Sequence, residues 1–293
     1  MPTDVPLRLL FLGNSFTHQG PVPELVRDVA ASVGWPAPEV AFYAPGGQSL
    51  AAPRTSEESL LLVDAGDWDF VVLQDFSTRP TDNVGDPQGF KADASWFYDR
   101  IKAASPAAQV VLYETWARHP DHSFYPNTFA TPLEMQAQLR FHYNDAADVF
   151  IPNNAGFVPA THVRVAPVGD AWEAHLGGPD PLRLHASDDY HAGDNGQYLN
   201  AVVLYSTIYG VVASGASGLG LPDRDAAALQ AAADATTGIT QAPPSFPQPP
   251  LAVGQTIRID FGSVASGESG WSTVTDCVDG ASFDLVGYRV AAD

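Results

Sequence analysis

The chain has 293 residues, with 34 acidic side chains against 14 basic ones and a formal net charge of −20 at pH 7. A surface this acidic repels nucleic acid, and the single cysteine, Cys277, excludes an intrachain disulfide and a cysteine-based zinc site. No apolar run reaches the roughly 18 residues of a membrane-spanning helix, and the length suffices for one α/β domain of roughly 200 to 240 residues plus a smaller appendage.

Strands and helices are predicted to alternate along most of the chain. The run 7–12 is apolar except at Arg8, as in a parallel strand covered on both faces, and it ends in the small, polar Gly13-Asn14-Ser15. Apolar residues with helical spacing follow over 21–33. The later predicted strands are residues 40–43, 70–73, 110–113 and 163–165. The later predicted helices are residues 57–63 and 94–104, a helix that begins at Pro132, and residues 197–212.

The helix that begins at Pro132 has a clear start signal. Thr131 is the expected N-cap, Pro132 takes the first helical position, and Glu134 completes a capping box. Repeated strand and helix units indicate a parallel sheet with helices on both faces. The predicted fold class is therefore α/β, with a three-layer α/β/α, flavodoxin-like arrangement.

Composition changes sharply at residues 241–250. This segment contains five prolines and is typical of a semi-rigid linker. Residues 256–261 then alternate as a strand does, and the later sequence is rich in glycine, serine, threonine and valine. We therefore expect a main domain over residues 1–240, a linker over 241–250 and a partial β-rich accessory module over 251–293.

Polar residues directly follow four of the predicted strands. They are Asn14-Ser15, Gly46-Gly47, Gln74-Asp75 and Glu114-Thr115-Trp116. In an open parallel sheet the ligand crevice lies at the carboxyl ends of the strands. The sequence therefore predicts that the functional site lies where these four segments meet.

Ser15 has two interpretations from local sequence alone. Gly13 allows the backbone to bend so that the hydroxyl faces the crevice as a nucleophile, but serine in this position also commonly caps a helix. A serine nucleophile needs a base, and the base needs an acid that fixes its tautomer. Asp188 and His191 are three residues apart and close enough to meet across one turn. The alternative for this pair is an exposed polar loop before a helix.

In this order, the motifs resemble those of the SGNH/GDSL hydrolase superfamily, over about residues 7–215. In that family the nucleophile lies in a Gly-Asp-Ser-type turn after the first strand, and here the turn is Gly13-Asn14-Ser15, with asparagine in place of aspartate. The last family block is Asp-x-x-His with a glycine five residues after the histidine. Asp188, His191 and Gly196 match this spacing.

The resemblance implies a serine hydrolase that needs no cofactor. Ser15 would be the nucleophile, His191 the base, and Asp188 the acid that orients the imidazole. The backbone amide of Ser15 and that of Gly46 or Gly47 would bind the oxyanion that develops during the reaction.

The third family block departs from the usual pattern. The expected Gly-x-Asn is absent, and the strand continues instead into Leu73-Gln74-Asp75-Phe76-Ser77. This segment looks like that of SGNH branches related to carbohydrate esterases, in which a glutamine occurs at this strand end. The resemblance therefore assigns the remaining oxyanion donor to Gln74, with Asp75 and Ser77 as alternatives.

Two other groups of residues draw attention. Trp116 and Tyr125 are expected to bind substrate by lining an acyl or sugar pocket, with core packing or loop anchoring as the alternative. The run His119-Pro120-Asp121-His122 and His185 contain residue types that bind metals. A proline-containing loop of this kind is more often an exposed turn, so no metal site is expected.

The function expected from the resemblance is carboxylic ester hydrolysis through an acyl-enzyme, with acetyl and other short-chain esters of carbohydrates as substrates. The alternatives are a lipase or thioesterase of the same superfamily, and a non-catalytic glycan-binding or surface protein. The expected partner is a small-molecule or glycan ester, not nucleic acid. The sequence leaves open the oligomeric state and the localisation, which is secreted or periplasmic if a signal peptide has been removed and otherwise cytoplasmic.

Overall fold

The computed structural model describes residues 5–156 and 163–244, together with the backbone of four short strands further along the chain. The contacts divide the chain into two compact units, Met1–Pro243 and Pro244–Asp293. The functional role of the second unit stays a prediction. The predicted limits of the main domain, the linker and the accessory module also stay predictions.

The first unit is built on a five-stranded parallel sheet with the strand order β2-β1-β3-β4-β5. Its strands are β1 (Arg8–Leu12), β2 (Glu39–Tyr43), β3 (Phe70–Leu73), β4 (Gln109–Tyr113) and β5 (Val163–Ala166). The predicted α/β class is therefore confirmed. In this strand order β1 lies between β2 and β3, so the segments that follow these three strands are neighbours at one edge of the sheet.

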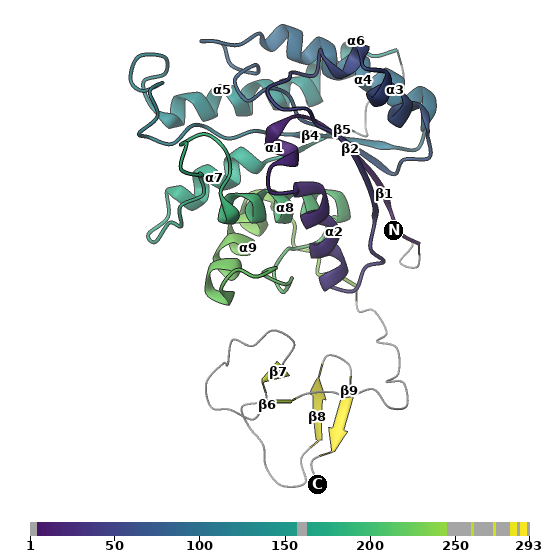
Figure 1. The fold of residues 1–293 in the computed structure, drawn as a ribbon, viewed down its shortest axis with the longest axis vertical. Coiled ribbons are helices and arrows are strands. Elements are labelled where there is room, and N and C mark those ends of the chain that lie inside the picture. Colours follow the sequence, from purple (N-terminus) through teal and green to yellow (C-terminus); the bar gives the residue numbers. More distant parts are fainter. Residues whose placement is uncertain are drawn as a thin grey trace. The chain divides into compact units, whose positions relative to one another are not determined.

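Helices cover both faces of the sheet. Figure 1 shows α3, α4 and α6 on one side of it and α2, α8 and α9 on the other. The helices are α1 (Ser15–His18), α2 (Val22–Ser32), η1 (Pro53–Thr55), α3 (Glu57–Asp64), α4 (Pro87–Ala104), α5 (Pro132–Asp145), η2 (Ala146–Phe150), α6 (Ile151–Asn154), α7 (Val168–Leu176), α8 (Asp194–Tyr209) and α9 (Asp223–Thr237).

Two predicted helices differ from the structure in their starting points. Helix α4 begins seven positions before the predicted residue 94, because the Asp86 side chain accepts a hydrogen bond from the Gly89 N–H at 2.9 Å and Pro87 occupies the first turn. Helix α8 was predicted over residues 197–212 but begins at Asp194 and ends at Tyr209. It ends there because the next residue, Gly210, takes the left-handed conformation with φ of 70°. The sequence analysis did not predict α7 or α9.

The strands direct alternate side chains to opposite faces of the sheet, as the pleat requires. On one face, Leu10 and Leu12 of β1 and Leu73 of β3 join a core cluster with Phe97 and Ile101 of α4. Phe97 is completely buried there. This packing holds α4 against the sheet close to the carboxyl ends of β1 and β3.

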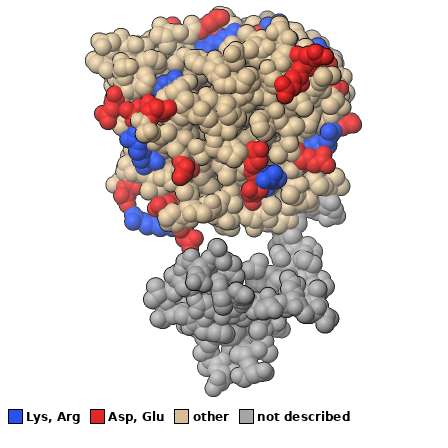
Figure 2. All heavy atoms as spheres, viewed as in Figure 1, with Lys and Arg blue, Asp and Glu red and all other residues tan. Residues whose placement is uncertain are grey.

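Acidic side chains are distributed over the surface of the first unit. Figure 2 shows them across the face in view, several of them beside a lysine or arginine. Ion pairs on this surface include Arg100 with Asp64 and Arg140 with Asp170. Within the described residues, no helix has both the length and the apolar character needed to cross a bilayer.

The second unit is described only by its strands. β6 (Ile259–Asp260) pairs in parallel with β7 (Ser272–Thr273), and β8 (Ser282–Leu285) pairs antiparallel with β9 (Tyr288–Ala291). Of the predicted strand 256–261, only residues 259 and 260 are described, and the remainder lies outside the described residues.

Replacing Phe97 by alanine is expected to lower the free energy of unfolding by about 3 to 5 kcal/mol, because the ring is completely buried in the core. Phe141→Ala is the matched control, since the Phe141 ring is 61% exposed and its loss should cost less than about 0.5 kcal/mol. Urea unfolding of both variants measures the difference. Equal effects would contradict this placement of the core.

Candidate active site

The turn between β1 and α1 places Ser15 at the edge of the sheet. Asn14 is the N-cap of α1, and its Oδ1 accepts a hydrogen bond from the Phe16 N–H at 3.0 Å. The interpretation of Ser15 as a helix cap is therefore wrong, because the residue before it performs that role. The Ser15 hydroxyl is free for another partner, although the residue is only 5% exposed.

Gly13 allows this turn to lie directly against the end of β3. The Gln74 side-chain oxygen accepts hydrogen bonds from the Asn14 N–H and from the Thr17 hydroxyl, both at 2.9 Å. A Cβ at Gly13 would lie 2.6 Å from that oxygen and 2.3 Å from Thr17 Oγ1. Only glycine therefore fits at this position without moving Gln74 or Thr17.

The loop that carries the histidine is an ordered hairpin-like segment before α8. The Ala186 N–H donates to the His191 carbonyl and the Gly193 N–H to the Leu184 carbonyl, both at 2.8 Å. Asp189 turns the chain with a φ of 60°, and its carboxylate accepts a hydrogen bond from Arg183 at 2.6 Å. These contacts favour a rigid loop over the exposed polar loop that the sequence left as the alternative.

Ser15, His191 and Asp188 lie in hydrogen-bonding contact with one another. The distance from Ser15 Oγ to His191 Nε2 is 3.0 Å, and that from His191 Nδ1 to Asp188 Oδ2 is 2.7 Å. Since the Asp188 carboxylate accepts a hydrogen bond from Nδ1–H, Nε2 is left as the acceptor for the serine hydroxyl.

The environment of Asp188 keeps its carboxylate charged. Burial would raise its pKa, but hydrogen bonds from the His191 ring and from the backbone N–H groups of His191 and Tyr190 lower the pKa to about 2. Asp188 is therefore ionised throughout the neutral pH range. This arrangement has the elements of an activated nucleophile: a hydroxyl, a base and an acid that orients the base.

The loop after β2 carries Gly46 and Gly47. It lies next to the turn Gly13-Asn14-Ser15, which is called the nucleophile turn below because it carries the predicted nucleophile. The Asn14 side-chain amide donates to the Gln48 carbonyl at 2.8 Å, which joins the loop to the turn. Gly47 adopts a positive φ of 71°, a conformation that other residues avoid. The oxyanion role of this loop stays a prediction, and the structure places it at the correct edge of the sheet.

Gln74 has a different set of contacts from those expected of a free oxyanion donor. Its oxygen accepts two hydrogen bonds from the nucleophile turn, so the orientation of the amide is fixed, and its nitrogen donates to the Asp75 carbonyl. The side chain is almost completely buried. Its predicted oxyanion role thus depends on the second amide hydrogen alone, whereas its support of the turn is directly visible.

The two aromatic residues assigned to substrate binding pack within the protein. Trp116 is completely buried, stacked on Phe16 with ring centroids 4.1 Å apart and on Trp172 at 4.4 Å. Its indole N–H donates to the Tyr190 carbonyl at 3.2 Å. Tyr125 is half-buried, and its hydroxyl donates to the Arg118 carbonyl at 3.2 Å. The contacts of Trp116 favour the alternative of core packing, and those of Tyr125 favour the alternative of loop anchoring.

Arg118 is a charged residue of the site that the sequence analysis missed. Its guanidinium lies 3.8 Å from the centre of the Tyr190 ring and donates to the Ser77 hydroxyl at 2.7 Å. Burial lowers its pKa to about 10, and no carboxylate of the described residues lies within ion-pairing distance of it. Its position two residues after Trp116, in the segment that follows β4, was the available signal.

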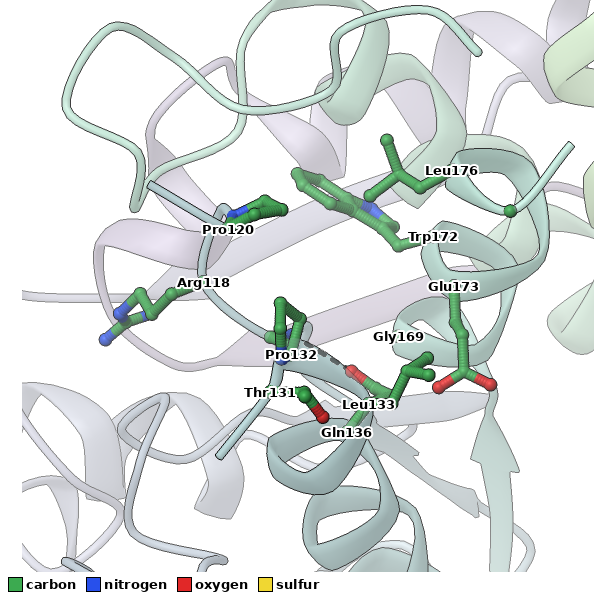
Figure 3. Close-up of a pocket in the computed structure, with 12 residues that line it drawn as sticks. Arg118, Pro120, Thr131, Pro132, Leu133, Gln136, Gly169, Trp172, Glu173 and Leu176 are labelled. Carbon is green, nitrogen blue, oxygen red and sulfur yellow. Dashed lines mark hydrogen bonds between the residues drawn. The ribbon is translucent and has the colours of Figure 1, made fainter. Parts of the chain in front are cut away.

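An apolar cavity of the first unit does not include Ser15. It has a volume of about 310 Å³ and lies between the start of α5, the end of α7 and the segment after β4. Figure 3 shows Pro120, Trp172 and Leu176 on one side of this cavity and Pro132 and Leu133 on the other. The guanidinium of Arg118 points away from it.

A second, more open cavity of about 460 Å³ adjoins the loop after β2. Gln48, which is bonded to Asn14, lines it together with Ser49, Phe76, Thr78 and Arg79. Most of these side chains carry hydrogen-bonding groups. The cavity therefore offers a polar space beside the nucleophile turn.

The histidines near the site have ordinary structural contacts. His185 is buried, its Nε2 donates to the Ala117 carbonyl at 2.9 Å, and burial lowers its pKa to about 4. The His119 Nδ1 lies 3.5 Å from carboxylate oxygens of both Asp121 and Asp189. Within residues 5–156 and 163–244, no group of three or more histidine, cysteine or acidic side chains is arranged to hold a metal ion.

Comparison with solved structures supports the assignment of the fold. A candidate SGNH hydrolase from Slackia heliotrinireducens is similar over 70% of this chain and 100% of its own, with 25% identity and a TM-score of 0.54. A DUF4886 family protein from Bacteroides uniformis is similar over 81% of this chain and 98% of its own, with 15% identity and a TM-score of 0.55, which shows a shared fold. No family model and no curated protein matches the chain.

Gly13→Ala is expected to lower the free energy of unfolding by about 1 to 3 kcal/mol, because the added methyl group overpacks the contact with Gln74 and Thr17. In Gly177→Ala, the control, the added methyl lies 3.3 Å from the Glu173 carbonyl oxygen and the residue already has helical dihedrals, so little loss is expected. Thermal or urea unfolding measures both. A Gly13 variant as stable as the parent protein would disprove the close contact.

Proposed function

We propose that this chain, a member of the SGNH/GDSL hydrolase superfamily, is a serine esterase in which Ser15, His191 and Asp188 carry out the reaction. The observation on which the proposal rests is the continuous hydrogen-bonded series from the Ser15 hydroxyl through the imidazole to a charged carboxylate. This series lies at the carboxyl edge of a parallel sheet, where such folds bind their ligands.

In the first half of the proposed reaction, Ser15 Oγ attacks the ester carbonyl and its proton passes to His191 Nε2. Asp188 stabilises the imidazolium that forms, and the backbone amides of Ser15 and of Gly46 or Gly47 bind the negative oxygen, with about 3 to 4 kcal/mol for each donor. The tetrahedral intermediate collapses, and the alcohol leaves with the proton from Nε2. In the second half, water attacks the acyl-enzyme with His191 again as base, and the carboxylic acid is released.

The surroundings of Ser15 favour a small acyl group. The nucleophile is only 5% exposed, and the rings of Phe16, Trp116 and Tyr190 pack against one another beside it. The cavity next to Gln48 is open and largely polar, as suits an alcohol with many hydroxyl groups. We therefore propose acetyl esters of carbohydrates as the substrate class, with the second amide hydrogen of Gln74 as a third oxyanion donor.

Ser15→Ala and His191→Ala are each expected to lower kcat on p-nitrophenyl acetate by at least about 10³-fold, since each removes one member of a unit that acts together. Ser123→Ala, which changes an exposed serine, is the matched control and should retain full activity. A fluorophosphonate probe should label the parent protein at Ser15 and leave the Ser15 variant unlabelled. Activity of Ser15→Ala equal to that of the parent protein would refute the nucleophile assignment.

Acyl chain length separates the proposed esterase from a lipase. With p-nitrophenyl esters from acetate to decanoate, we expect kcat/KM to be highest for acetate and to fall as the chain lengthens, because aromatic rings occupy the space beside Ser15. Release of acetate from acetylated xylan or acetylated monosaccharides then tests the alcohol. A maximum at octanoate or decanoate would favour the lipase alternative instead.

A further inference from the structure

Asp75 is a buried acidic residue for which the proposed reaction has no role. It follows Gln74 at the carboxyl end of β3 and is completely inaccessible to solvent. Its Oδ1 accepts hydrogen bonds from the Leu50 N–H at 3.0 Å and from the Phe76 N–H at 2.6 Å. Its Oδ2 lies 3.1 Å from the Arg79 guanidinium. An ionised carboxylate is costly to bury, so contacts this specific call for an explanation.

The hydrogen bond from Leu50 is the contact with functional significance. Leu50 ends the loop that carries Gly46 and Gly47, and this bond connects the loop to a residue 25 positions further along the chain. The middle of the same loop is held from the other side, where the Asn14 amide donates to the Gln48 carbonyl. The candidate oxyanion loop therefore has two anchors, one on the nucleophile turn and one on Asp75.

We infer that Asp75 is a positioning residue for the proposed ester hydrolysis: its ionised carboxylate fixes the loop 46–50 so that a backbone N–H of the loop reaches the oxyanion formed at Ser15. This inference rests on the proposed function. Asp75 itself exchanges no proton with substrate, because it is buried and each of its carboxylate oxygens has a donor.

The charged groups around Asp75 come from several elements. Arg79, on the same loop as Asp75, also forms an ion pair with Asp93 of α4 at 2.7 Å. Asp93 in turn forms an ion pair with Arg54 of η1. Asp86, the N-cap of α4, lies 3.9 Å from the Arg79 guanidinium. Tyr143 of α5 also interacts with Asp75, and burial raises its pKa and keeps it neutral.

These surroundings make the anchor sensitive to pH. Burial raises the pKa of Asp75 to about 6, although Arg79 and the N–H groups of Phe76 and Leu50 oppose the shift. The carboxylate is therefore ionised above about pH 6 and takes up a proton below it. A protonated carboxyl loses its charge-assisted hydrogen bonds, which are roughly twice as strong as neutral ones. Activity should then fall with acidification as the loop is released from Asp75.

Three variants test the inference. Asp75→Ala removes the acceptor for the Leu50 N–H, whereas Asp75→Asn retains an oxygen in that place and removes the titration. Asp93→Asn is the matched control, since it also removes a buried carboxylate from Arg79 but has no contact with the loop. The measurements are kcat and KM on p-nitrophenyl acetate from about pH 4.5 to 9, and hydrogen exchange of residues 46–50.

For Asp75→Ala we expect kcat to fall about tenfold or more with little change in KM, together with faster exchange of the loop amides. Asp75→Asn should have an activity at pH 8 between those of the parent protein and Asp75→Ala, because its neutral oxygen still accepts the Leu50 N–H but without charge assistance. The acid limb of its pH–activity profile should have a slope about one proton shallower than that of the parent protein, since residue 75 no longer takes up a proton. Asp93→Asn should show the parent slope, parent loop exchange and a kcat within about threefold.

The inference is overturned if Asp75→Ala keeps kcat within about threefold and normal loop exchange, or if the acid limb of Asp75→Asn is as steep as that of the parent protein. If Asp75→Ala does not fold, the slope of the acid limb of the Asp75→Asn profile still tests the inference. If the parent protein hydrolyses no ester, the proposed function fails, and hydrogen exchange alone then shows whether Asp75 holds the loop.

Discussion

The contact between the backbone of Gly13 and the side chain of Gln74 is the constraint on which the site depends. Leu12 of β1 and Leu73 of β3 are register partners, so the next residue on each strand meets the other at the sheet edge. With no Cβ at Gly13, the Gln74 oxygen comes close enough to bind the Asn14 N–H and the Thr17 hydroxyl. Leaving these buried donors unpaired would cost about 1 to 3 kcal/mol each. The position of Ser15 thus follows from the pairing of two strands.

The strands could be predicted from the sequence because parallel strands covered on both faces are short apolar runs. Helix α9 escaped prediction since it is rich in alanine and its buried stripe, Ala226, Leu229 and Ala233, is weakly apolar. Helix α7 is short and has no side-chain N-cap hydrogen bond that would mark its start.

At the site, motif order and spacing grouped Ser15, Asp188 and His191, and the structure places these three side chains in one hydrogen-bonded series, whose catalytic role is a proposal. The contacts of Asn14, Asp75 and Arg118 could not be derived in the same way, because their partners lie far away in sequence: Asn14 with Gln48, Asp75 with Leu50 and Arg118 with Tyr190. Pattern reasoning finds residues that share a local motif. It does not find those whose function depends on a tertiary contact.

The stacked rings of Phe16, Trp116 and Trp172 extend from the residue after the nucleophile to the wall of the apolar cavity. The two indoles are 4.4 Å apart and inclined by only 10°, so their electronic transitions couple. Aromatic rings held in fixed tertiary packing give a near-ultraviolet circular dichroism signal, which is lost when that packing loosens. Because Trp116 also donates to the Tyr190 carbonyl, beside His191, this optical signal comes from the wall of the site itself. The optical signal of these rings thus reports on the packing beside the proposed active site without any added label.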